Sequence, residues 1–172
     1  MSSEEKRYKD EYDRKMRKFE EEMKLFKEQN KMKFEAITKG KIKWKYTNTE
    51  GLKCDGEYEG QLRFGRPNGL GRFTSFEGNW KIEGEWRDGR LHGKTIQYSP
   101  EGDEIMYKKK DGKLNGSFIW YNPNGSRKES EWRNGREHGK KRFYTETGDV
   151  SQEIVYAFGK QKKNRLSESM AF

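Results

Sequence analysis

Glycines recur at a fixed interval over most of this chain. Three glycine series share an interval of 23 residues: Gly89, Gly112 and Gly135; Gly93, Gly116 and Gly139; and Gly102, Gly125 and Gly148. Tyrosines keep the same interval at Tyr98, Tyr121 and Tyr144, and one step earlier the glycine interval is 24 residues. Several series in one register are hard to produce by chance. The chain after about residue 40 is therefore built from one structural unit that is used several times.

The repeat contains strong hairpin signals. Asp88-Gly89, Asp111-Gly112 and Asn134-Gly135 are typical of type I′ turns, which need positive φ at two successive residues. Segments of alternating polarity precede these pairs, short strands follow them, and the third glycine series closes a second turn. Two strands and two turns account for one repeat. The sequence predicts a mainly β fold, an extended single-layer antiparallel β-meander in which each hairpin contacts chiefly its neighbours.

Residues 82–93 read Ile-Glu-Gly-Glu-Trp-Arg-Asp-Gly-Arg-Leu-His-Gly and resemble the MORN repeat. The core of that repeat is Gly-Glu-Trp, two variable residues, Gly, two variable residues and His-Gly. From about Tyr107 onward the repeats resemble a looser MORN variant, because Tyr107 and Ser130 occupy the place of Gly84. The resemblance covers about residues 55–160 and four repeats. It implies an adaptor surface of a kind used in membrane-associated, cytoskeletal, ciliary and enzyme-linked proteins.

The segment from Glu4 to about Ile37 contains no Gly or Pro and is rich in Glu, Lys, Arg and Met, which predicts a long α-helix. Its apolar residues are spaced as in the seam of a heptad pattern: Tyr12, Met16, Phe19, Met23 and Phe26. Only about two clean heptads occur, too few for a self-sufficient coiled coil, so we expect this docking stripe to pack on the protein's own sheet or on a partner. The composition changes at Gly40. We divide the chain into a charged helix (1–39), a repeat sheet (40–160) and a basic tail (161–172).

Composition limits the kind of core and the setting of the protein. The chain is 39% charged with a net charge of +9, and only 29% of its residues are apolar, almost half of them aromatic. These values indicate a thin, ordered structure. No segment approaches the roughly 20 apolar residues of a membrane span, and no export signal is visible. We expect a cytoplasmic protein in a cytoskeletal or ciliary setting, with a peripheral subunit of a mitochondrial or other membrane-associated complex as the alternative.

The reactive residue types in this sequence do not form the pattern of an active site. His92 and His138 occupy one repeat slot, which elsewhere holds Asn68 and Asn115, so we interpret the slot as a hydrogen-bonding position beside the turn and prefer this to a proton-transfer or metal role. Cys54 is the only cysteine, which excludes an internal disulfide. No hydrolase elbow, phosphate-binding loop or nucleotide fingerprint is present. We expect no catalytic residue, no metal and no cofactor, hence no enzyme. Acidic residues on outward strand positions are expected to pair with Arg87 or Arg133: Glu59, Glu83, Glu85 and Glu131.

Function is therefore expected to lie in surfaces. We predict a non-enzymatic scaffold or structural subunit that binds protein partners in a larger complex. An aromatic face of the sheet is the expected interaction site: Trp86, Tyr98, Trp120, Tyr121, Trp132, Phe143 and Tyr144. The alternative is a peripheral membrane module that binds acidic lipid headgroups through two basic strips: Lys108, Lys109, Lys110, Lys140, Lys141 and Arg142.

Two further partner classes follow less directly. Nucleic acid is an unlikely partner, because the aromatic side chains that would stack on bases are the material of the core. The later repeats also resemble those of some bacterial antitoxin-like proteins, which makes a protein-neutralising role a third, more remote hypothesis.

Overall fold

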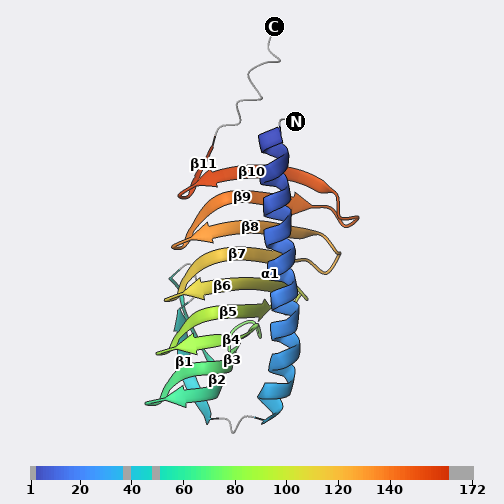
Figure 1. Ribbon diagram of the computed structural model, residues 1–172. Helices are drawn as coiled ribbons and strands as arrows, with labels where there is room; N and C mark the ends of the chain where they lie inside the picture. The colour runs from blue at the N-terminus through green and yellow to red at the C-terminus, as the bar shows by residue number, and fades with distance from the viewer. Residues whose placement is uncertain (1–2, 37–39, 48–50, 163–172) are drawn as a thin grey trace.

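The computed structural model describes residues 3–36, 40–47 and 51–162, and shows one helix followed by one sheet (Figure 1). Helix α1 (Ser3–Ala36) is followed by eleven antiparallel strands whose order in the sheet equals their order in the chain. The strands are β1 (Gly40–Thr47), β2 (Lys53–Arg63), β3 (Arg66–Ser75), β4 (Lys81–Arg87), β5 (Arg90–Tyr98), β6 (Glu104–Lys110), β7 (Lys113–Tyr121), β8 (Arg127–Arg133), β9 (Arg136–Tyr144), β10 (Val150–Ala157) and β11 (Lys160–Gln161). The predicted mainly β meander with a preceding helix is confirmed. Of the tail predicted at 161–172, residues 163–172 lie outside the described part.

The tight turns have the predicted conformation. Asp88 and Gly89 both have positive φ, at 48° and 82°, and the pairs at 111–112 and 134–135 repeat this geometry. Aspartate, asparagine and glycine are the residues that tolerate this region best. Two further turns of the same kind, at Phe64-Gly65 and Phe158-Gly159, were not predicted, because phenylalanine is no turn signal.

A second set of glycines shapes the strand that follows each tight turn. Gly93 has a φ of 100°, and opposite it the register between β4 and β5 shifts around Glu85. The Glu85 carboxylate accepts a hydrogen bond from the N–H of Lys94 at 2.7 Å. A Cβ at Gly93 would lie 2.0 Å from that carboxylate, so the bulge requires glycine. The register shift recurs in the hairpins β2–β3, β6–β7 and β8–β9, so four successive tight-turn hairpins each contain a bulge.

The first strands fold back over one face of the sheet, which we call the back face. Tyr46 of β1 packs against the rings of Phe73, Trp80 and Trp86, and its hydroxyl accepts a hydrogen bond from Lys109 of β6 at 2.9 Å. In Figure 1, β1 accordingly runs across the hairpin ends at the lower left. This cover buries an aromatic cluster: Tyr46, Tyr58, Phe73, Ile82, Trp86 and Leu91. The first half of the back face is thus a closed core.

The opposite face, which we call the front face, is crossed by α1 (Figure 1). The helix packs on Ile96, Met106 and Ile119, which lie on β5, β6 and β7. Its axis runs across the strands, and its N-terminal end lies near β10 in Figure 1. A sheet of one layer needs such cover, because an apolar face must be buried against another element.

Candidate interaction surfaces

The helix stripe is buried against the chain's own sheet. Tyr12, Met16, Phe19, Met23 and Phe26 are each 6% exposed or less. They form one cluster with the apolar residues of the front face. Of the two alternatives for this docking stripe, the structure shows packing on the protein's own sheet. The stripe is therefore not exposed for a partner.

Helix pitch and strand spacing explain why the stripe fits. Tyr12 lies at β9, where Arg142 is 4.4 Å from its ring, and Phe26 lies at β5, where Lys94 is 5.8 Å from its ring. These two helix positions are about 21 Å apart along the axis. Four strand spacings from β9 to β5 amount to about 19 Å. Each step of the heptad seam therefore advances by about one strand, and the stripe meets a new strand at each residue.

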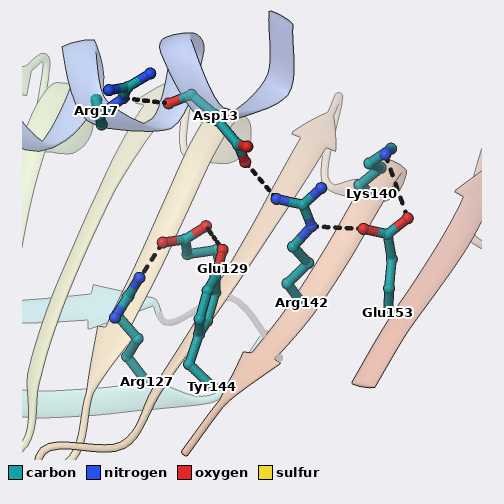
Figure 2. A network of polar contacts seen from close by, with 8 residues as sticks. All are labelled: Asp13, Arg17, Arg127, Glu129, Lys140, Arg142, Tyr144 and Glu153. Carbon is teal, nitrogen blue, oxygen red and sulfur yellow. Dashed lines mark hydrogen bonds and ion pairs between the residues drawn. The ribbon is translucent and has the colours of Figure 1, made fainter. Parts of the chain in front are cut away.

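A polar contact beside the stripe joins the helix to the sheet. Arg142, which is 4% exposed, bonds the carboxylates of Asp13 on the helix and Glu153 on β10 (Figure 2). Burial disfavours the Arg142 cation, but its hydrogen bonds with Glu153, Tyr144 and Asp13 outweigh burial and raise its pKa. A buried cation that is paired on both sides can contribute stability, whereas an unpaired one would be costly.

A neighbouring group of polar side chains lies beneath the same end of the helix. Glu129 is buried and accepts hydrogen bonds from Tyr144 at 2.7 Å and Arg127 at 3.1 Å (Figure 2). Burial and the contact with Glu129 raise the pKa of Tyr144 to about 12. Tyr144 is therefore a structural donor on the front face.

The predicted aromatic face is divided between the two sides of the sheet, which corrects its description as one face. Tyr98 and Tyr121 pack against the helix cluster on the front face, and Tyr144 bonds Glu129 there. Trp86 lies in the closed core of the back face, 3% exposed. The back face of the later repeats holds the other three: Trp120, Trp132 and Phe143. Consecutive strand residues point to opposite faces, so Trp120 and Tyr121 cannot share a surface.

We name the back face of β7–β9 the open aromatic surface and define it by Phe118, Trp120, Trp132, Phe143, Lys128 and Lys141. All six side chains are half-buried. The Lys128 ammonium lies 4.3 Å from the Trp120 ring, and Lys141 lies 5.6 Å from the Phe143 ring. Burial lowers the pKa of Lys128. Rings with lysines above them combine apolar contact area with positive charge.

The two basic strips are largely neutralised inside the protein, and neither forms a continuous patch. Lys108 donates a hydrogen bond to Glu22 of the helix at 2.7 Å, and this bond, helped by the charges of nearby lysines, lowers the Glu22 pKa although burial acts to raise it. Lys109 is buried on the opposite face, and only Lys110 is exposed. In the second strip, Lys140 pairs with Glu153 and Lys141 with Glu137, while Arg142 is buried as described.

The slot shared by His92 and His138 has the predicted structural role. The His92 Nδ1 accepts a hydrogen bond from the N–H of Asp111 at 3.2 Å, and His138 accepts one from Phe158 at 3.4 Å. Asn68 and Asn115 do the same for the turns at Asp88 and Asn134. Each slot therefore holds the next hairpin turn. In the described part of the chain, no three His, Cys, Asp or Glu side chains are grouped so as to hold a metal ion.

The expected pairing of carboxylates with Arg87 or Arg133 is wrong. Glu83 pairs with Arg72, and Glu131 pairs with Lys15 of the helix. Arg87 and Arg133 instead flank tight turns, directly opposite Arg90 and Arg136. Sequence reasoning missed this arrangement, although the signal was visible as a basic residue on each side of the turn pair.

Comparison with known families supports the repeat unit. The MORN repeat model matches residues 58–80, 83–104 and 129–140, which lie in the hairpins described above. These three segments of the chain are MORN repeats. MORN repeats are a non-catalytic repeat family that generally takes part in protein–protein or membrane–lipid interactions. No curated protein matches the chain. Over its described residues, helix α1 is not long and apolar enough to cross a membrane.

Proposed function

We propose that this protein is a non-enzymatic scaffold subunit that binds a protein partner through the open aromatic surface. The observation that carries the proposal is the contrast in burial between equivalent residues. Trp86 in the closed core is 3% exposed, whereas Trp132, two repeats later, is only half-buried. Large rings that remain partly exposed are typical of interaction sites, where tryptophan contributes strongly to binding.

The chemistry of this surface indicates what would fit it. Phe118, Trp120 and Trp132 offer apolar area, and Lys128 adds positive charge beside them. The Lys128 ammonium, 4.3 Å from the Trp120 ring, is a hydrogen-bond donor at this surface. A partner with apolar side chains, bordered by carboxylate or carbonyl acceptors, would fit both the rings and this donor.

The other candidate surfaces support this choice. The helix stripe is already covered by the sheet, and the two basic strips are mostly paired internally. We therefore favour the scaffold hypothesis over lipid binding through those strips. The cytoplasmic setting, in a cytoskeletal or ciliary assembly, remains part of the proposal by family analogy.

The test is affinity capture from the source cell with point variants of the full chain. Trp120→Ser with Phe143→Ser changes the open aromatic surface, while Phe76→Ser, at a residue 58% exposed, is the matched control. We expect a defined set of proteins with the parent chain and the control, and its loss with the double variant. Recovery of the same proteins with all three chains would refute the proposal. Deleting α1 is a poorer test, because it would uncover Ile96, Met106 and Ile119.

A further inference from the structure

Five tight turns form one edge of the sheet, which we call the hairpin-tip edge. The turns are Phe64-Gly65, Asp88-Gly89, Asp111-Gly112, Asn134-Gly135 and Phe158-Gly159. In Figure 1 the hairpin ends stack along the left side of the sheet. Each turn glycine after the first donates its N–H to a carbonyl of the preceding hairpin, as Gly89 does to Pro67 and Gly112 to Leu91, at 2.8 and 3.1 Å. The tips therefore form a fixed row, with about 10 Å between neighbours and about 40 Å in all.

Each tip carries exposed cations. In the first four tips two basic residues face each other across the strands: Arg63 and Arg66, Arg87 and Arg90, Lys110 and Lys113, Arg133 and Arg136. Lys160 follows the fifth turn. All nine side chains are exposed, and none of them forms an ion pair within the described part of the chain. Like charges placed directly opposite each other are destabilising, so the fold itself gains nothing from this row.

An exposed aromatic residue stands at the first tip. Phe64 is 90% exposed and has a φ of 51°. A bulky side chain is unfavourable in this backbone region, where three other tips have Asp or Asn. Its ring meets only the Arg63 guanidinium, 5.3 Å from its centre, among the described contacts. Backbone strain combined with exposure of a large apolar ring points to a role outside the fold.

A hollow opens beside the same edge. It has a volume of about 400 Å³, and its lining includes Arg66, Arg90 and Lys113 from three successive tips together with the buried Lys109. Two turn aspartates also line it, and cations outnumber them. An anionic side chain entering from the edge would meet net positive charge here.

We propose that the hairpin-tip edge binds an extended acidic segment of a protein, with an apolar residue of that segment placed on Phe64. A single straight row of cations matches a linear partner, and an extended chain of about twelve residues spans its length. Six of the nine cations are arginines, which bind carboxylates in a bidentate manner. Asp88 and Asp111 interrupt the row. They would repel the uniform charge of a nucleic-acid backbone or an anionic bilayer, but they suit a peptide that offers N–H donors.

This inference names the partner chemistry of the proposed scaffold function, but at a different surface from the open aromatic surface. The two surfaces are therefore tested by different variants. Loss of one binding activity leaves the other measurable.

The experiment measures the affinity of the full chain for a labelled peptide of about fifteen residues, long enough to span the row. The peptide contains Glu and Asp with one Leu at each end, and binding is followed by fluorescence anisotropy at low salt, where exposed charges are least screened. An oligonucleotide of equal charge and vesicles containing phosphatidylserine are the comparison ligands. The tip variant changes Arg87, Arg90, Arg133 and Arg136 to Gln. The control variant makes the same charge change on the exposed helix surface, at Lys9, Arg14, Lys18 and Lys31.

We expect the tip variant to bind the peptide at least about fourfold more weakly than the parent, since four exposed ion pairs are lost and each is worth about 0.2–1 kcal/mol. The control variant should stay within about twofold of the parent, because its cations lie on the helix, away from the tips. Phe64→Asn should weaken peptide binding while raising the melting temperature, because Asn tolerates positive φ; a purely structural Phe64 would lower both. Equal losses in the tip and control variants, or binding of vesicles or oligonucleotide but not of the peptide, would overturn the proposal.

Discussion

The two halves of the back face are built on the same repeat, yet they carry different side chains. Ile82 and Leu91 are fully buried beneath the β1 fold-back, and the residues two repeats later are Lys128 and Glu137. The backbone is the same in both halves, with the same tight turns and bulges. The difference teaches that the repeat determines the strands and turns, whereas the element that covers a strand determines which side chains it can carry.

The largest expected difference in the free energy of unfolding is between variants of two tryptophans at equivalent repeat positions. Trp86 is buried and its indole donates to the carbonyl of Gly71, while Trp132 is half-buried. Trp86→Ala should lower the free energy of unfolding by about 3–5 kcal/mol, and Trp132→Ala by about 1–2 kcal/mol. Urea denaturation of both variants measures the difference. Equal losses would show that the later half is as closed as the first.

The helix stripe gives the next contrast, between the two sides of α1. Met23 is fully buried and Leu25 is 54% exposed. Met23→Ala should cost about 2–4 kcal/mol through the lost contacts and the cavity, and Leu25→Ala less than about 0.5 kcal/mol. Thermal unfolding with both variants provides the measurement. A small effect at Met23 would mean that the helix does not pack on the sheet.

The pH dependence of stability gives another test, at Lys109. This buried residue occupies the repeat position that Trp86 and Trp132 occupy in the neighbouring repeats. Burial lowers its pKa from 10.5 to about 8. Below pH 8 both folded and unfolded chains keep the proton, and the folded state bears the full cost of a buried charge. Between pH 8 and 10.5 the folded state loses the proton first, so the Lys109 contribution to stability rises with pH.

From pH 8 to 9.5 this rise should amount to about 1–2 kcal/mol. The upper limit of the range limits the opposing contribution of the buried tyrosines. Burial raises the pKa of tyrosines such as Tyr58, so their contribution to stability falls as the tyrosines of the unfolded chain ionise at higher pH. This contribution is the same in the parent and the control. Lys109→Met is the control, since it removes the Lys109 proton and should flatten this part of the profile. Identical profiles for the parent and Lys109→Met would contradict a buried, destabilising cation.

The smallest expected effect on stability is at the repeat position of His92, whose side chain accepts a hydrogen bond from the next hairpin turn. His92→Asn should change stability by less than about 0.5 kcal/mol, because asparagine fills the same slot at two other repeats. His92→Leu should cost about 0.5–1.5 kcal/mol, since the Asp111 N–H loses its acceptor. Chemical denaturation distinguishes them. A large loss in the asparagine variant would assign the histidine a role beyond accepting this hydrogen bond.

Much of the fold could be predicted from the sequence, because glycine at a positive φ leaves a local signal at every repeat. Asp111-Gly112 predicts a turn without knowledge of the rest of the chain. The heptad spacing from Tyr12 to Phe26 likewise predicts a one-sided helix. In both cases the determining interactions lie within a few residues.

The surfaces were predicted less well, for two physical reasons. Neighbours in a strand point to opposite faces, so the run of Lys108, Lys109 and Lys110 is divided among the front face, the back face and a hairpin tip. The strand period alone would have revealed this. The contact between Tyr46 and Lys109, by contrast, joins strands far apart in the sequence. No local pattern could indicate which half of the back face is covered.

The central claim is that α1 covers the front face of its own chain and leaves the open aromatic surface for a partner. Methyl NMR on a dilute sample tests it most directly, by recording NOEs between Met16 or Met23 of the helix and Ile96, Met106 or Ile119 of the sheet. A mixture of labelled and unlabelled chains separates contacts within one molecule from contacts between two. We predict NOEs within one molecule at every concentration. Their absence, or their appearance only between molecules, would contradict this account.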